Sequence, residues 1–145
     1  LSLHDSLPIF QQLAPHSDEL SINPMIIQRN TIVDRLYRNR EYRPPWLWSL
    51  VEMIRQVHPV ESRLIVHPTA AGKSRGSHNC GKCDKEVAAA IERYSVSCDI
   101  MEFEGLSCEC QEIWSSEIQL DGSIPVPLGI GLNRRTSIEE CLMSP

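Results

Sequence analysis

Long apolar runs are missing from this sequence, and with them the usual means of crossing a membrane. No apolar stretch approaches the roughly 18 to 20 residues that a membrane-spanning helix needs. The first residues also lack the basic, apolar and small-residue order of a secretory signal. We therefore expect no membrane partner and an intracellular protein, cytoplasmic or organellar, or one delivered as an effector. Away from oxidising compartments, cysteines bind metals more often than they form disulfides.

An excess of positive charge is missing as well. The 14 Lys and Arg residues are outnumbered by 19 Asp and Glu residues, which gives a formal net charge of −5. This balance argues against nonspecific binding to duplex nucleic acid, because that affinity comes from basic side chains that neutralise phosphates.

The arginines are nevertheless concentrated in one place. Five of them lie between positions 29 and 43, and tyrosines and tryptophans are interleaved with them or follow them. Guanidinium groups suit phosphates and aromatic rings suit unstacked bases, which is typical of surfaces that bind single strands. The alternative interpretation is an ordinary solvated helix face. The residues that we predict to contact single-stranded RNA or DNA are Arg35, Arg38, Arg40, Trp46 and Trp48.

The chain has the size of one domain. Its 145 residues can bury a single core without disulfides. We predict one domain over residues 1–145, in which residues 115–145 form a C-terminal extension. Residues 1–15 resemble translated sequencing-adapter sequence, and we treat them as artefactual or disordered.

Apolar spacing and turn residues predict an α/β fold. Helices are expected over residues 26–40, with Asn30 as a helix cap, and over residues 45–57 and 84–94. Strands are expected over residues 62–67 and 96–103. Because one helix joins these strands, they should be parallel neighbours in a right-handed crossover. We expect an irregular segment over residues 108–114 and a last helical turn over residues 137–143.

The most informative motif is Cys80-Gly-Lys-Cys83, at the start of the helix predicted over residues 84–94. Two thiols at this spacing can face one ion or each other, and a helix N-terminus lowers a thiol pKa toward the thiolate form. Such a pair serves a catalytic zinc site, a redox dithiol or a structural zinc site, and the plainest alternative is two unrelated buried thiols. A second cluster, with Cys98 before it, gives a hypothetical structural metal site made of Cys98, Cys108, Cys110 and His78.

Together these residues resemble the DYW family of nucleic-acid cytidine deaminases. In that family a C-x-x-C helix start is followed by a helix, a strand, Phe, Gly and C-x-C-x-x-x-W. Here the same order is formed by Cys80 to Cys83, residues 84–94 and 96–101, Phe103, Gly105 and the segment from Cys108 to Trp114. The resemblance covers about 35 residues, from Cys80 to Trp114.

The resemblance implies a cytidine-deaminase-like three-layer sandwich with a mixed central sheet, and zinc-dependent deamination of cytosine to uracil in single-stranded nucleic acid, as in RNA editing. The zinc would be bound by Cys80, Cys83 and one histidine, for which His58 and His16 are candidates, with His67 as a third. The bound water would attack the base. Glu61 or Glu19 would transfer the proton.

Two other functions remain open from the sequence. In a thioredoxin-like oxidoreductase, Cys80 would be the attacking thiolate and Cys83 the resolving thiol. Alternatively, the cysteines belong to a noncatalytic zinc-binding module. The cysteines beyond the first pair count against the redox domain, which has no use for them.

Overall fold

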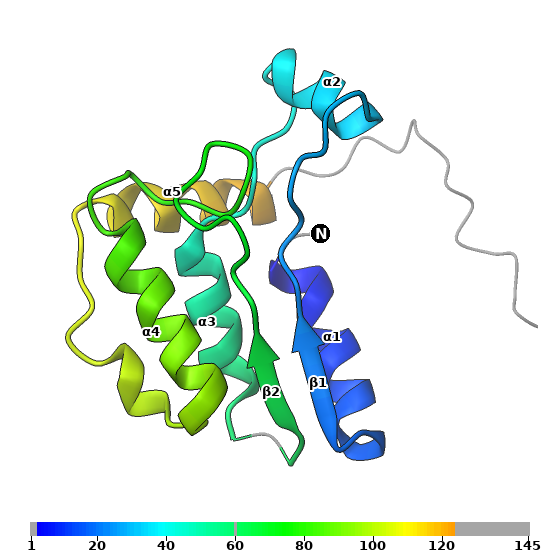
Figure 1. Cartoon of the computed structure of the whole chain (residues 1–145), viewed down its shortest axis with the longest axis vertical. Helices are drawn as coiled ribbons and strands as arrows, with labels where there is room; N and C mark the ends of the chain where they lie inside the picture. The colour runs from blue at the N-terminus through cyan, green and yellow to red at the C-terminus, as the bar shows by residue number, and fades with distance from the viewer. Residues whose placement is uncertain (1–2, 60, 124–145) are drawn as a thin grey trace, which may run out of the picture. The chain divides into compact units, whose positions relative to one another are not determined.

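The computed structural model describes residues 3–59 and 61–123. Its elements in chain order are α1 (Leu3–Leu13), the 3-10 helix η1 (Ala14–His16), β1 (Glu19–Ile22), α2 (Ile32–Arg38), α3 (Leu47–Val57), β2 (Arg63–Val66), α4 (Asp84–Ser97), the 3-10 helix η2 (Ile100–Phe103) and α5 (Cys110–Ser123) (Figure 1). The chain divides after Trp114 into two units, so that α5 begins in the first and ends in the second. Among the described residues, no helix is both long enough and apolar enough to span a bilayer.

The first unit has a small parallel sheet. β1 pairs with β2 in a register that runs from Glu19 opposite Arg63 to Ile22 opposite Val66. Parallel neighbours need a long crossover connection, and here it carries α2 and α3. The predicted α/β class is thus confirmed. The three-layer deaminase sandwich is not, because the sheet in the described part of the chain has two strands.

The strand predicted over residues 96–103 is wrong. α4 continues to Ser97, and Cys98 ends it with a left-handed φ of 55°. Asp99 then accepts a hydrogen bond from the Met101 amide and starts η2. The apparent alternation misled because Val96 is 81% exposed and belongs to the solvent face of a helix. The predicted crossover between residues 62–67 and 96–103 fails with this strand.

The other boundaries are closer to the expected ones. β2 lies inside the predicted strand, α3 begins two residues after Pro45, and α4 begins at Asp84 as predicted. The segment expected to be irregular starts α5 instead. Residues 3–13 form α1, in the segment that the sequence analysis treated as artefactual or disordered and for which it predicted no helix. The turn predicted over residues 137–143 lies outside the described residues.

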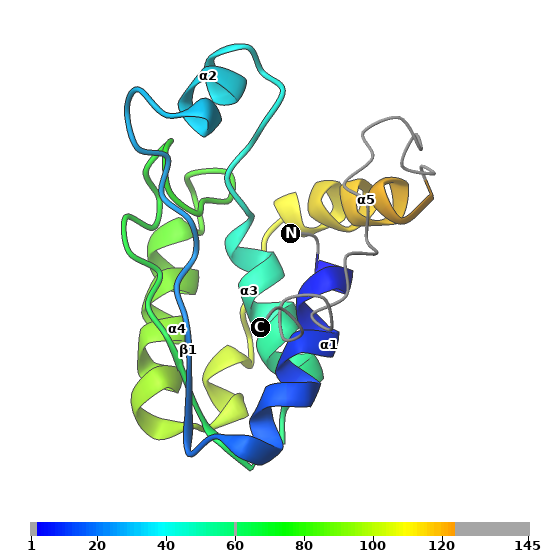
Figure 2. The same cartoon turned by 90° about the vertical axis from the view of Figure 1, so that its right-hand side faces the viewer.

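The core lies between α3, α4 and β2. Each helix presents a stripe at spacings of three and four residues, which is the pattern of one buried helix face. The buried members are Leu47, Leu50, Val51 and Ile54 on α3, and Val87, Ala90, Ile91 and Tyr94 on α4. Tyr94 stacks on Phe103 of η2 with ring centroids 5.3 Å apart. Figure 2 shows α1 alongside α3, with which it is in contact.

α2 lies at the opposite end of this unit from the start of the two strands (Figures 1 and 2). Its cap is Thr31, whose side chain accepts a hydrogen bond from the Asp34 amide, and not Asn30 as predicted. Asn30 has a left-handed φ of 62° and therefore stands outside the helix. At the C-terminal end of α2, the left-handed φ of 63° at Arg40 prevents the helix from continuing. These two turns shorten the helix relative to the predicted residues 26–40.

Candidate metal centre

The turn that carries Cys80 and Cys83 is fixed by the first residue of the helix after it. The Asp84 carboxylate accepts hydrogen bonds from the Asn79 amide at 2.9 Å and from the Gly81 amide at 2.6 Å. Gly81 has a φ of 89°, a conformation that glycine adopts without a steric penalty. The turn brings the Cys80 and Cys83 sulfurs to 4.0 Å from each other.

Cys108 and Cys110 lie at the start of α5. The Cys108 amide donates to the Gln111 side chain at 2.9 Å, and the Gln111 amide donates back to the Cys108 carbonyl at 2.9 Å. The Gln111 side chain caps the Cys108 amide as Gln does in a capping box, whereas the return bond ends on the Cys108 carbonyl and not on its side chain. Both cysteines are therefore positioned by a helix start, as Cys80 and Cys83 are.

The two pairs meet in one four-sulfur cluster. The sulfurs of Cys80 and Cys108 are 3.7 Å apart, and those of Cys83 and Cys110 are 3.6 Å apart. All four sulfurs lie within 4.8 Å of one another. Cys83 and Cys110 are buried, Cys108 is half-buried and Cys80 is exposed. None of these four thiols is in a disulfide. An ion bound by all four would be reached from solvent on the side of Cys80, and the apolar core would lie on its other side, next to Cys83 and Cys110.

The two buried sulfurs each receive a hydrogen bond from a nitrogen. The Asn79 side-chain amide donates to Cys83 at 3.3 Å, and the Trp48 indole donates to Cys110 at 3.2 Å. Asn79 also accepts a hydrogen bond from the backbone amide of Trp48. Donors of this kind around metal ligands fix the ligand orientation and stabilise the charged sulfur.

The four thiols differ in their acidity. The backbone amides of Lys82 and Cys83 lower the pKa of Cys80 to about 6. Burial raises the pKa of Cys83 to about 12, and burial also raises the pKa of Cys110. Without a cation, the buried sulfurs therefore keep their protons at neutral pH. A bound dication would compensate the negative charge of the thiolates and allow them to form together.

The sequence analysis assigned these cysteines to two separate sites, and the structure brings both pairs together. Cys98 is exposed at the far end of α4, about 20 Å from Cys83 if a 14-residue helix rises 1.5 Å per residue. The ring Nδ1 of His78 lies 2.8 Å from the Gly76 carbonyl, and His78 is not among the clustered ligands.

The remaining predicted metal ligands and proton carriers are not among the clustered ligands. His58 follows the last residue of α3 and contacts the Tyr94 ring edge-on, at a centroid distance of 6.4 Å. His16 ends η1, and His67 follows β2. Glu19 is an exposed residue at the start of β1, and Glu61 is exposed just before β2. Within the described part of the chain, the group of potential ligands contains cysteines alone.

The predicted nucleic-acid contacts also differ in their surroundings. Arg35 and Arg38 are exposed on α2, and Arg40 follows it. The Arg43 guanidinium lies 3.5 Å from the centre of the Trp46 ring. Trp48, in contrast, is 2% exposed and lies in the core beneath the cysteines, where a base has no access. The sequence did not reveal its role as a donor to sulfur, because the contact joins positions 62 residues apart.

Comparison with known proteins points to archaeal relatives. The chain is 36% identical over 123 residues to the archaeosine synthase subunit beta of Methanosarcina acetivorans, a match that covers 83% of this chain and 35% of the relative. It is 39% identical over 104 residues to the protein of the same name from Thermococcus kodakarensis, with 69% of this chain and 32% of the relative covered. An uncharacterized protein of Methanocaldococcus jannaschii is 30% identical over 115 residues, with 76% and 31% covered. No protein-family model and no solved structure matches the chain.

The extent of these matches matters for the cysteines. The first match covers 83% of 145 residues, or about 120 consecutive positions, so it includes residues 26–120 wherever it begins. All four clustered cysteines therefore lie inside the aligned region. The chain spans about a third of the length of the curated relatives that it matches.

The relatives overturn the resemblance to DYW deaminases. Proteins named archaeosine synthase subunit beta match most of the chain, so the assignment as a zinc-dependent cytidine deaminase, a hydrolase that acts in RNA editing, is wrong. The motif order misled because C-x-x-C, a helix and C-x-C can equally well converge on one four-cysteine site. The strand that should separate them is also missing. The proton-transfer roles of Glu61 and Glu19 lose their basis with the deaminase.

Proposed function

We propose that Cys80, Cys83, Cys108 and Cys110 bind one zinc ion in a structural, noncatalytic module. The sulfur spacing is the observation that carries this proposal. Zinc binds thiolates at about 2.3 Å in a tetrahedron, which separates the sulfurs by about 3.8 Å. Three of the sulfur pairs here are separated by 3.6, 3.7 and 4.0 Å, and all four sulfurs lie within 4.8 Å of one another.

The same spacing disfavours other cysteine chemistry. A redox dithiol needs two thiols, whereas four converge here, and a cluster of several irons needs more room between its thiolates than a single ion does. Four thiolates fill a tetrahedral zinc, so no position remains for water. The ion would therefore tie the turn before α4 to the start of α5 and would not activate a substrate.

The relatives supply the biological setting of the proposal. Archaeosine is a modified nucleoside of archaeal tRNA, and "subunit" in the relatives' name describes a protein that assembles with another. We propose that the protein to which this chain belongs acts in the synthesis of that nucleoside, with RNA as its substrate and a second protein as its partner. The zinc module would stabilise the part that meets the RNA.

Metal analysis of the purified 145-residue chain tests the zinc centre. We expect one zinc per wild-type chain and a much lower content in Cys110→Ser. The matched control is Cys98→Ser, which removes an exposed cysteine outside the cluster and should keep one zinc. A full zinc content in Cys110→Ser, or a chain that contains iron in place of zinc, would contradict the proposal.

A further inference from the structure

A cleft opens between α2 and the turn that leads to the metal cluster. It has a volume of about 360 Å³, within the usual range for a small-molecule site. Its walls come from the last turn of α2, the linker to α3, and the residue two positions before Cys80. The side chains that matter are Tyr37, Arg40, Glu41, Tyr42, Arg43 and His78.

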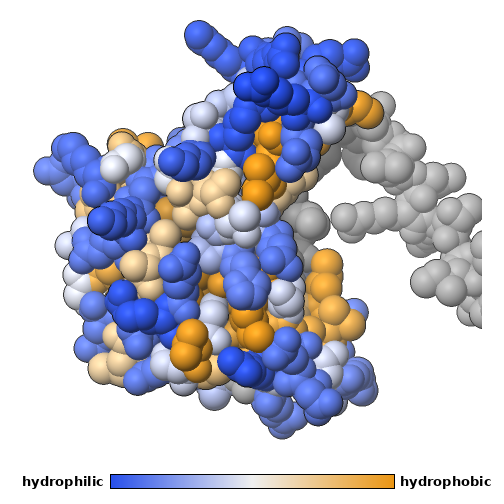
Figure 3. Space-filling model, in the orientation of Figure 1, coloured by the Kyte–Doolittle hydropathy of each residue, from blue (hydrophilic) through white to orange (hydrophobic). Residues whose placement is uncertain are grey.

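The lining combines the two features that bind single-stranded nucleic acid. Tyr37 and Tyr42 offer ring faces on which a base can stack, and Arg40 and Arg43 offer positive charge for phosphates. The α2 end of the molecule is also the most strongly hydrophilic region of the face shown in Figure 3.

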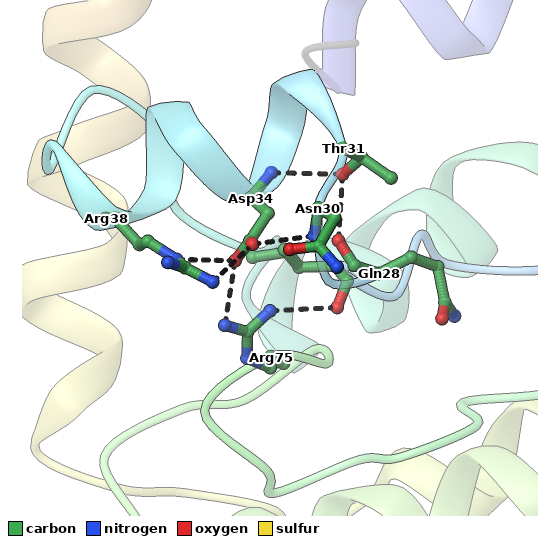
Figure 4. A network of polar contacts seen from close by, with 7 residues as sticks. Gln28, Asn30, Thr31, Asp34, Arg38 and Arg75 are labelled. Carbon is green, nitrogen blue, oxygen red and sulfur yellow. Dashed lines mark hydrogen bonds and ion pairs between the residues drawn. The ribbon is translucent and has the colours of Figure 1, made fainter.

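The walls of the cleft are held together by a buried carboxylate (Figure 4). Asp34 is 2% exposed and pairs with Arg38 of its own helix and with Arg75 of the following loop, each at 2.8 Å. Arg75 also donates to the Ile27 carbonyl at 3.3 Å and lies 5.5 Å from the centre of the Tyr37 ring. The other wall is tied down where the His78 amide donates to the Pro45 carbonyl.

This network gives structural roles to two of the arginines near the cleft. Arg38 and Arg75 already neutralise Asp34, so an incoming phosphate would have to compete with a buried carboxylate for them. Arg40 is exposed and lines the cleft, and Arg43 lines it with its guanidinium stacked on the Trp46 ring. The negative charge of Glu41 repels a phosphate from one wall of the cleft. The same carboxylate can accept hydrogen bonds from N–H groups on the edge of a base. The charges therefore favour one orientation, with phosphates toward the arginines and the base edge toward Glu41.

We infer that this cleft binds one unpaired nucleotide of an RNA strand, with its base against Tyr37 and Tyr42 and its phosphates against Arg40 and Arg43. The inference rests on the proposed function for the choice of RNA, and it goes further by naming the site and the single-stranded form of the ligand. A base in a duplex is stacked on both faces and has none to offer a tyrosine, so paired RNA should bind more weakly.

The test is fluorescence anisotropy with the full 145-residue chain, a labelled single-stranded RNA, a blunt RNA duplex and an unmodified tRNA transcript. Tyr42→Ala should weaken single-strand binding about five- to one-hundred-fold, while Tyr42→Phe, which keeps the ring, should bind like wild type. Arg40→Gln should lower the slope of log affinity against log salt by about 0.7, the value for one lost phosphate contact on a single strand. The control is Arg63→Gln, an exposed arginine at the start of β2, which should change neither quantity.

The outcomes separate this inference from the proposed function. Zinc content is measured on every variant, and a variant that keeps its zinc and its circular dichroism spectrum is folded. If Tyr42→Ala and Arg40→Gln both bind the single strand as tightly as wild type does, the inference about the cleft is wrong, although the protein still binds RNA. Binding of the duplex as tight as that of the single strand would also overturn it. If the wild-type chain binds none of the three RNAs, both the inference about the cleft and the proposed RNA substrate are wrong. The zinc centre is tested separately, by metal content alone.

Discussion

The indole nitrogen of Trp48 lies 3.2 Å from the sulfur of Cys110 and donates a hydrogen bond to it. This contact joins the first turn of α3 to the first residue of α5. A second contact of the same kind lies nearby, where the Trp114 indole donates to the Ser49 hydroxyl at 2.9 Å. Two tryptophans thus bridge the same two helices, and one of them ends on a proposed metal ligand while the other does not.

This pair allows a matched test of the sulfur contact. Trp48→Phe removes the N–H donor to Cys110 and should weaken zinc binding about ten- to one-hundred-fold, the usual effect of losing a partner of a metal ligand. Trp114→Phe also removes an indole from the helix contact but leaves every sulfur with its donors. Competition with a chromophoric chelator measures the zinc affinity of both variants.

Both substitutions shrink an aromatic side chain and should lower the free energy of unfolding. The decisive quantity is therefore the ratio of the two zinc affinities. Equal zinc affinity in Trp48→Phe and Trp114→Phe would show that the indole of Trp48 supports the core and does not tune the metal centre.

Removal of the metal should destabilise the folded chain. A ligand that binds only the folded state stabilises it by about 4 kcal/mol when its free concentration is a thousandfold above Kd. We therefore expect EDTA to lower the wild-type Tm by several degrees, read by circular dichroism at 222 nm. A Cys80→Ser, Cys83→Ser double variant should melt at the same temperature with and without EDTA, and a wild-type Tm that ignores the chelator would contradict a structural role for the metal.

Local sequence patterns were sufficient for the elements that depend on neighbours in the chain. The start of α4 follows from Asp84 after a C-x-x-C turn, and the buried stripe of α3 follows from apolar spacing. The strand β2 follows from Leu64, Ile65 and Val66. β1 did not follow, because four residues with one buried position carry too weak a pattern.

The metal cluster shows where such patterns stop. The two cysteine pairs could each be recognised, but their meeting depends on contacts between α3 and α5. Trp48 and Cys110 are 62 residues apart in the sequence, and Trp114 and Ser49 are 65 residues apart. The false strand over residues 96–103 then placed the pairs apart. Asp84 as a clamp on the turn could have been suspected from an acidic residue directly after the C-x-x-C motif.

Asp34 makes the stability of the α2 region dependent on pH. The Asn30 amide, with Arg38 and Arg75, lowers the pKa of Asp34 to about 2 from an ordinary value of 3.8. A lowered folded-state pKa means that the contribution to stability is complete above about pH 4 and is lost as the pH falls toward 2. The unfolding free energies of wild type and Asp34→Asn, measured with urea, should therefore differ most above pH 4 and converge toward pH 2.

Taking the difference between the two proteins at each pH removes the effect of acid on the thiolates, which both share. Glu102→Gln is the control at neutral pH, because Glu102 forms an exposed ion pair with Arg93 and should contribute less than about 1 kcal/mol. A difference between wild type and Asp34→Asn that stays constant from pH 6 to pH 2 would contradict the assigned ion pairs.

Cys98 closes α4 in a conformation that suits another residue better. Its φ of 55° lies in the left-handed region, its amide donates to the Tyr94 carbonyl, and its side chain is exposed. Glycine reaches this region without the steric penalty that a side chain incurs, and it is the residue that helices most often use there. Cys98→Gly should therefore raise the free energy of unfolding by up to about 1 kcal/mol, after the entropy gained by the unfolded chain is subtracted.

The same variant should keep one zinc per chain. Urea unfolding of this one protein therefore tests the helix end, and its metal analysis tests the exclusion of Cys98 from the cluster. A loss of zinc in Cys98→Gly would return Cys98 to the set of ligands, and a lower unfolding free energy would contradict the left-handed end of α4.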